Sequence, residues 1–232
     1  SNLYIKTLMQ IIKAVIFDLD GTLIDSLDTY NLAFNRIVRR YQLKPIDIRE
    51  MADFLNQFLS LEQLLTQLYP SLSPDQIKSF MAEMKTEFIA LSKDHITLQP
   101  HVKEVLQTLK EQGMKIGVAT GRMSKGDSKW RDLKNLDIDW LVDVVVTGGE
   151  TKPKPDPASL LKCTQELGIS LSECIFVGDS RADVIAGKSA GVSVIAVLTG
   201  VASRDQLAQE MPDYMMDSLA LLPEHIMKLH QD

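Results

Sequence analysis

The chain has few of the features that would assign it to a secreted, membrane or nucleic-acid-binding class. It contains only two cysteines, Cys163 and Cys174, without CxxC or metal-ligand spacing, which favours free buried thiols in a reducing compartment. No run approaches the roughly 20 apolar residues that a membrane span needs, and no signal-peptide cleavage pattern is present. The formal net charge of −6 gives no general attraction to nucleic acid or anionic membrane. We therefore expect a cytoplasmic protein with no nucleic-acid or membrane partner.

What the sequence does contain is typical of a globular protein. With 45% hydrophobic residues over 232 positions, the chain can bury one large core or a main core with a smaller attached one. Residues 1–10 precede the first strong pattern, and Met9 is a candidate natural start, so they carry no part of the predicted mechanism.

Short β-branched and aromatic runs recur along the chain and alternate with amphipathic segments. The runs are 13–18, 115–120, 141–147, 174–179 and 193–199. This alternation predicts an α/β fold with a parallel sheet and helices on both faces. Because ligands of such sheets bind beyond the carboxyl ends of the strands, the residues that end these runs should meet at one edge. These residues are Asp18, Thr120, Thr147 and Asp179.

The segment 24–95 interrupts the alternation with helical periodicity and no strand-like run. It predicts an inserted α-helical domain, which leaves 11–23 and 96–232 as the sheet-containing core. The apolar stripes in 30–41, 48–59 and 77–91 are interpreted as the core of a helical bundle. Ser73 and Pro74 suit the cap and the first turn of one of its helices.

Asp18 and Asp20 stand two residues apart at the end of a predicted buried strand, before Gly21 and Thr22. Two close carboxylates are costly unless a cation or a proton holds them, so the pair is a candidate metal and acid–base site. A turn in which Asp20 caps the backbone is the structural alternative.

Further elements fit phosphoryl transfer, although each alone has a structural explanation. Thr120, before Gly121, can donate to a phosphate oxygen or simply end a strand. Lys152, in TKPKPDP, can meet a bound anion or lie in an exposed loop. Asp179 and Asp183 share one face of a first helical turn, where they can bind a divalent cation or cap the helix.

Four motifs in order identify the chain as resembling the haloacid dehalogenase superfamily, in its phosphatase branch and similar to phosphoglycolate phosphatase-like proteins. They are DLDGT at 18–22, VATG at 118–121, KPKPDP at 152–157 and GDSRAD at 178–183. The resemblance implies a Rossmann-like sheet with a helical cap inserted after the first motif, and a Mg²⁺-dependent phosphatase acting on a small phosphoester.

The resemblance also implies residue roles. Asp18 attacks phosphorus and forms an aspartyl-phosphate, while Asp20 protonates the leaving alcohol and then activates water. Mg²⁺ is bound by the Asp18 carboxylate, the Asp20 backbone carbonyl and Asp179, with Asp183 beside them. Thr120 and Lys152 bind the transferring phosphoryl group, and the turn residues Gly21, Thr22 and Gly121 are expected to help bind substrate. A monomer or homodimer is expected.

Several alternatives stay open on the sequence. Phosphomutases share all four motifs, and a non-catalytic phosphate-binding regulatory module is a less favoured reading. Asn56 and Gln57 of the cap are candidate substrate contacts or surface amides. Arg122 can contact an acidic substrate or sit exposed in a turn, and Lys154 is the alternative to Lys152. The cap segment 52–65 has no Gly or Arg where phosphoglycolate phosphatase-like relatives often carry a Gly-containing substrate loop.

Overall fold

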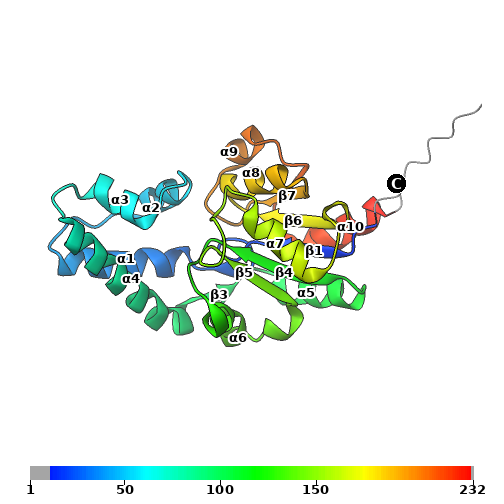
Figure 1. Cartoon of the computed structure of the whole chain (residues 1–232), viewed down its shortest axis with the longest axis horizontal. Helices are drawn as coiled ribbons and strands as arrows, with labels where there is room; N and C mark the ends of the chain where they lie inside the picture. Colours follow the sequence, from blue (N-terminus) through cyan, green and yellow to red (C-terminus); the bar gives the residue numbers. More distant parts are fainter. Residues whose placement is uncertain (1–10, 231–232) are drawn as a thin grey trace, which may run out of the picture.

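A six-stranded parallel sheet forms the centre of the computed structural model, which describes residues 11–230 (Figure 1). Residues 1–10, including the candidate start at Met9, lie outside the described part. In chain order the strands are β1 (Ala14–Phe17), β4 (Lys115–Thr120), β5 (Val144–Thr147), β6 (Cys174–Gly178), β7 (Ser193–Val197) and β8 (Tyr214–Met216). Their spatial order is β5-β4-β1-β6-β7-β8. The predicted α/β fold class is confirmed, and β8 is an addition: a three-residue edge strand is too short to show a pattern in the sequence.

Helices cover both faces of the sheet because both faces of its strands are apolar. On β1, Val15 and Phe17 belong to the core cluster on one face, whereas Ala14 and Ile16 belong to the cluster on the other. The first face is covered by α5 (Val102–Glu111), α6 (Arg131–Asn135) and α10 (Leu222–Leu229). The second is covered by α7 (Ala158–Leu167), α8 (Arg181–Ala190) and α9 (Arg204–Gln209). Short 3₁₀ turns span Gly126–Trp130, Asp139–Leu141, Leu171–Glu173 and Leu219–Leu221.

Four helices follow β1 and lie at one end of the molecule (Figure 1). They are α1 (Leu27–Arg40), α2 (Ile48–Leu55), α3 (Leu61–Leu68) and α4 (Pro74–His95). They enclose their own apolar cluster, in which the Phe34 and Phe80 rings lie 5.4 Å apart. Ser73 caps α4 and Pro74 occupies its first turn, as predicted. The inserted helical cap of the predicted fold class is therefore present.

Two short strands join the helical part to the sheet part. β2 (Ile24–Asp25) pairs antiparallel with β3 (Thr97–Leu98), so the chain leaves and re-enters the core side by side. β2 begins just after the DLDGT turn, and the Gln99 N–H that follows β3 donates to the Leu23 carbonyl oxygen at 2.9 Å, so both connections lie beside that turn.

The prediction that the whole 48–59 stripe is bundle core is wrong at its carboxyl end. Met51 is fully buried, but Leu55 and Phe58 are each 39% exposed. Leu55 is the last residue of α2, and Phe58 lies beyond the helix with a left-handed φ of 61°, so helical spacing does not extend to Phe58.

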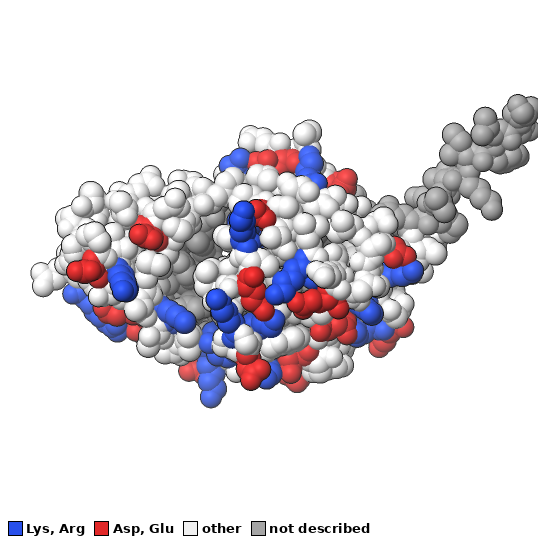
Figure 2. Space-filling model, viewed as in Figure 1, with Lys and Arg blue, Asp and Glu red and all other residues white. Residues whose placement is uncertain are grey.

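Lysine, arginine and acidic side chains are mixed on the face in Figure 2, which also shows a hollow between the helical part and the sheet part. In the described part of the chain, no helix has the length and apolar character to cross a bilayer.

Candidate active site

Three neighbouring strands bring the predicted site residues to one edge of the sheet. Asp18 directly follows β1, Thr120 ends β4 and Asp179 directly follows β6, and these strands are adjacent in the order β4-β1-β6. Thr147, which ends β5, is used differently, because its hydroxyl donates to the Ser124 carbonyl oxygen at 2.6 Å.

A cluster of three carboxylates forms the centre of this edge. One oxygen from each of Asp18, Asp179 and Asp183 lies within 4.8 Å of the others, and the residues are 8%, 2% and 1% exposed. Burial, reinforced by the Asp183 charge, raises the pKa of Asp18 to about 7. Burial, together with the charges of Asp18 and Asp183, raises the pKa of Asp179 well above its usual range. Ionising all three carboxylates therefore destabilises the protein unless positive charge is placed beside them.

Backbone and one hydroxyl enclose the Asp179 carboxylate. Thr22 Oγ1 donates to Oδ1 at 2.7 Å, and the Val201 N–H donates to Oδ2 at 3.2 Å. A Cβ at Gly21 or at Gly200 would collide with this carboxylate, and Gly21 also adopts a left-handed φ of +84°. Gly21 and Thr22, expected to help bind substrate, thus lie against a carboxylate of the cluster. Gly200 was missed, although a Thr-Gly pair ends the run 193–199 just as one ends 115–120.

Asp183 both caps a helix and faces the carboxylate cluster, whereas the sequence left open which of these roles it has. Its Oδ2 caps α8 by accepting from the Ser180 N–H at 3.0 Å and from Ser180 Oγ at 2.7 Å. Its Oδ1 accepts from Lys154 Nζ at 2.5 Å. Helix capping therefore orients the oxygen that faces the cluster.

The lysine beside the cluster is Lys154, and the placement of Lys152 there was wrong. Lys154 Nζ donates to Asp18 Oδ1 at 2.7 Å and to the Ala119 carbonyl oxygen at 2.9 Å, as well as to Asp183. Its side chain is 7% exposed, whereas Lys152 is exposed. Both lysines precede a proline in TKPKPDP, so sequence register alone could not separate them. Burial alone would lower the pKa of Lys154, but Asp18 and Asp183 outweigh it and raise that pKa.

The charges of the cluster fit a divalent cation. Three ionised carboxylates against one ammonium leave two uncompensated negative charges, and carboxylate oxygens are the ligands that Mg²⁺ prefers. The hydrogen bonds from Thr22 and Val201 fix the oxygens of Asp179 in place. The residues present therefore suit Mg²⁺ in charge and in donor type.

Asp20 lies outside that cluster and is held by Arg122. Arg122 Nε donates to Asp20 Oδ2 at 2.8 Å and Nη2 donates to Oδ1 at 2.6 Å. Ser26 Oγ also donates to Oδ1, at 2.5 Å. Burial opposes ionisation of Asp20, but the Arg122 guanidinium outweighs it and lowers the pKa of this carboxyl. Arg122 is thus neither an exposed turn residue nor free for an acidic substrate, because its remaining Nη1 donates to Asp132.

Thr120 is buried at the end of β4, two residues before Arg122. Its Oγ1 accepts from the Arg122 N–H at 3.2 Å, and a hydroxyl that accepts in this way can still donate its hydrogen. Gly121 follows with open space at its Cβ position. These features suit a phosphate-facing turn.

The two predicted cap amides differ. Asn56 is 5% exposed and its Oδ1 has no hydrogen-bond partner in residues 11–230, whereas Gln57 is exposed. The Phe58 ring lies 5.2 Å from Arg181 Cζ, at the start of α8. The turn after α2 therefore contacts the element that carries Asp183.

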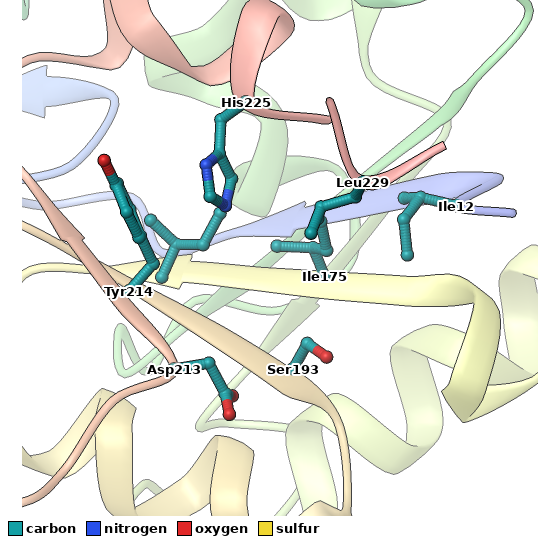
Figure 3. Close-up of a pocket in the computed structure, with 8 residues that line it drawn as sticks. Ile12, Ile175, Ser193, Asp213, Tyr214, His225 and Leu229 are labelled. Carbon is teal, nitrogen blue, oxygen red and sulfur yellow. The ribbon is translucent and has the colours of Figure 1, made fainter. Parts of the chain in front are cut away.

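A separate pocket of about 160 Å³ lies at the opposite ends of the strands (Figure 3). Ile12, Ile175 and Ser193 line it near the starts of β1, β6 and β7, and His225 contributes from α10. It shares no residue with the carboxylate cluster, so it does not form part of the candidate active site.

Comparison with known proteins agrees with the geometry of the site. The family model for haloacid dehalogenase-like hydrolases matches residues 15–197. The chain is 32% identical to pyrophosphatase PpaX of Bacillus cereus (strain AH820), over 91% of this chain and 95% of the relative. It is 30% identical to a phosphoglycolate phosphatase of Vibrio vulnificus (strain CMCP6), over 92% and 95%.

A solved structure shares the arrangement of the elements. The crystal structure of a predicted phosphoglycolate phosphatase from Haemophilus somnus 129pt superposes with a TM-score of 0.84 at 26% identity, covering 92% of this chain and 97% of that one.

Exchange of the two lysines tests the corrected placement. Lys154→Met removes the ammonium that bonds Asp18 and Asp183, so we expect phosphatase turnover to fall by about 10²-fold or more. Lys152→Met should stay within about threefold of wild type. Steady-state assays on both folded variants decide between them, and the reverse order of losses would contradict the placement.

The raised pKa of Asp18 predicts that the free energy of unfolding of the metal-free protein depends on pH. The folded-state pKa of about 7 exceeds the usual 3.8, so the folded state retains a proton that the unfolded chain loses. This carboxyl therefore lowers the free energy of unfolding as pH rises from about 4 to about 7, with no further change above that. In excess chelator, Asp18→Asn should exceed wild type in melting temperature by a margin that grows by at least about 3 °C between pH 5 and pH 8. A constant margin would contradict this assignment.

Proposed function

The chain belongs to the haloacid dehalogenase-like hydrolase family and is a phosphoric monoester hydrolase, and on that premise we propose that it is a Mg²⁺-dependent phosphatase of a small phosphorylated metabolite. Asp18 is the proposed nucleophile. The observation that supports this most is the buried carboxylate of Asp18 held by Lys154 within the cluster of Asp179 and Asp183.

The two oxygens of Asp18 differ in a way that suits nucleophilic attack. Oδ1 accepts from Lys154, whereas no hydrogen bond within residues 11–230 engages Oδ2, and the side chain keeps 11% exposure. Oδ2 forms the bond to phosphorus as the bond from phosphorus to the leaving oxygen breaks. The product of this step is an aspartyl-phosphate on Asp18.

An anionic nucleophile that approaches a phosphate must be offset by positive charge already in place. Lys154 supplies one such charge. The Asp18 carboxylate, the Asp20 backbone carbonyl and Asp179 would hold Mg²⁺, with Asp183 beside them. When bound, Mg²⁺ supplies the remaining positive charge that the phosphoryl group requires.

Asp20 is the proposed acid and base of the two steps. In the second step the ionised Asp20 that Arg122 favours takes a proton from the attacking water, as the bond between Asp18 and phosphorus breaks and inorganic phosphate leaves. The proton taken up in that step is the one that Asp20 gives to the leaving oxygen of the next substrate. Thr120 and Gly121 contact the phosphoryl oxygens. Lys154 takes the phosphate-binding role that the sequence motif assigned to Lys152.

The helical segment 24–95 is proposed to close over this edge and select the substrate. Asn56 supports this role, because a buried amide oxygen without a partner is costly unless a bound molecule or water engages it. Gln57 and Phe58 lie in the same turn, and Phe58 contacts Arg181 of the core. The two relatives are named as a phosphoglycolate phosphatase and a pyrophosphatase, which supports a small phosphorylated compound as the substrate class.

The cysteines are consistent with a cytoplasmic location as part of this proposal. Cys163 and Cys174 are free and buried, and burial raises the pKa of Cys174 to about 11. Thiols of this kind are inert in a reducing compartment.

Metal removal and loss of the nucleophile test the proposed function together. Release of inorganic phosphate from a panel of phosphorylated metabolites should require Mg²⁺, stop with chelator and return when Mg²⁺ is restored. Asp18→Asn should lower turnover by about 10³-fold or more while the protein stays folded, because the attacking anion is gone. Full activity after exhaustive metal removal, or near-normal turnover of Asp18→Asn, would exclude this mechanism. Transfer to a sugar hydroxyl without phosphate release would instead indicate a phosphomutase.

The cap proposal predicts a change of substrate ranking. Asn56→Ala should reorder the metabolites by kcat/KM while hydrolysis of a generic aryl phosphate stays within about threefold. Gln67→Ala, an exposed amide on α3, is the matched control and should preserve the order. Equal losses on every substrate in Asn56→Ala would place selection elsewhere.

A further inference from the structure

The loop after β7 lies against the Asp179 carboxylate. Strand β7 pairs in parallel with β6, and Asp179 directly follows β6, so the two strand ends lie side by side. The Val201 N–H donates to Asp179 Oδ2 at 3.2 Å, and a Cβ on Gly200 would collide with the same oxygen. The backbone of residues 199–201 therefore approaches this carboxylate more closely than a side chain on Gly200 would allow.

Apolar packing and one backbone hydrogen bond hold both ends of this loop. Ala202 is 6% exposed and belongs to the apolar cluster beneath α8 and α9, and Leu198 packs against the same cluster. The Leu198 N–H donates to the Met216 carbonyl oxygen of β8 at 3.0 Å. The backbone of the loop is thus fixed from either side.

Thr199 joins this loop to the DLDGT turn. Its Oγ1 donates to the Gly21 carbonyl oxygen at 2.7 Å. The next residue of that turn, Thr22, donates from Oγ1 to Asp179 Oδ1 at 2.7 Å. One oxygen of Asp179 is therefore held by the turn and the other by the loop, and Thr199 bonds the turn and the loop to each other.

Gln99 ties the loop to the same turn from a second side. It directly follows β3, where the chain returns from the helical segment. Its Nε2 donates to the Thr199 carbonyl oxygen at 3.2 Å, and its N–H donates to the carbonyl oxygen of Leu23, just after the turn, at 2.9 Å. Both polar groups of the Thr199 residue that face this region, the hydroxyl and the carbonyl, are therefore engaged.

This network has a specific consequence for cation binding by Asp179. Each carboxylate oxygen has two lone pairs, so one hydrogen bond on each oxygen leaves a lone pair for a cation. Mg²⁺ requires near-ideal octahedral geometry, whereas Ca²⁺ accepts irregular arrangements of its ligands. Hydrogen bonds that orient a ligating group typically contribute about 10- to 100-fold to metal affinity. The direction in which Asp179 is held therefore matters more for Mg²⁺ than for Ca²⁺.

From this network we propose that Thr199 is a positioning residue for the Mg²⁺ ligand Asp179, acting through the Gly21 carbonyl and the loop 199–201. The proposal rests on the proposed function, in which Asp179 binds Mg²⁺. It gives a role to the Thr-Gly pair that ends the run 193–199, which none of the four motifs contains. Because Thr199 is uncharged, its loss alters the direction of the carboxylate and leaves the charge of the site unchanged.

Cation binding to the metal-free protein provides the test, because it requires no turnover. The Kd values for Mg²⁺ and for Ca²⁺ are obtained from the rise of the melting temperature with cation concentration, which also shows that each variant is folded. Asp179→Asn sets the reference and should raise the Kd for Mg²⁺ by about tenfold or more. Thr199→Val should raise the Kd for Mg²⁺ by at least about fivefold and the Kd for Ca²⁺ by less than about twofold. Thr199→Ser, which keeps the donor, should restore both values to within about twofold of wild type.

Thr108→Val is the matched control, because Thr108 Oγ1 also donates to a backbone carbonyl oxygen, that of Glu104 at 2.9 Å, in α5. It should leave both Kd values unchanged. If Asp179→Asn leaves the Kd for Mg²⁺ unchanged, the metal site of the proposed function fails, and the role of Thr199 with it. If Asp179→Asn weakens Mg²⁺ binding while Thr199→Val does not, or weakens Mg²⁺ and Ca²⁺ equally, the positioning role alone is overturned. Should Thr199→Val not fold, Gln99→Met, which removes the bond to the Thr199 carbonyl oxygen, decides by the same ratio of Kd values.

Discussion

The salt bridge from Lys154 to Asp18 and Asp183 is the interaction on which the active edge depends. Parallel strands deliver Asp18 and Asp179 to one point, and the α8 cap delivers Asp183, so three carboxylates meet where water is largely excluded. Without a buried ammonium and a cation, repulsion would separate them or hold protons on them. The same excess of negative charge that destabilises the metal-free protein favours the binding of Mg²⁺.

The two aspartates of the DLDGT turn receive opposite environments. Burial and neighbouring carboxylates raise the pKa of Asp18, whereas the Arg122 guanidinium lowers the pKa of Asp20 against the effect of burial. The backbone turn at Gly21 separates their side chains, and Thr22 supports Asp179 from the same turn. The ionised form of Asp20 that Arg122 favours suits the base step of the proposed mechanism, whereas Asp18 needs the charge of Lys154 and of a cation to stay ionised as the proposed nucleophile.

Sequence patterns predicted the parallel sheet, the helical insertion and the start of α4 at Ser73, because each depends on local periodicity or capping. They also predicted Asp18 and Asp179, because strand ends of a parallel sheet converge, and Asp183, because it shares the first helical turn after Asp179. Lys154 could not be separated from Lys152, since the path of a proline-rich turn decides which lysine points inward. The pairing of Arg122 with Asp20 joins residues 102 positions apart, and its contact with Asp132 joins a turn to a helix, so neither leaves a periodic signal. The exposed Leu55 and Phe58 mark where helical periodicity ends.

Covalent transfer of the phosphoryl group to Asp18 is the central step of the proposed mechanism. Enzyme mixed with a labelled phosphoester and Mg²⁺ can be quenched in acid within milliseconds, digested and analysed by mass spectrometry. We expect one phosphoryl group on the Asp18-containing peptide, which appears before inorganic phosphate and decays at least as fast as turnover. Rapid release of phosphate with no label on Asp18 at any time, or label on another residue, would contradict it.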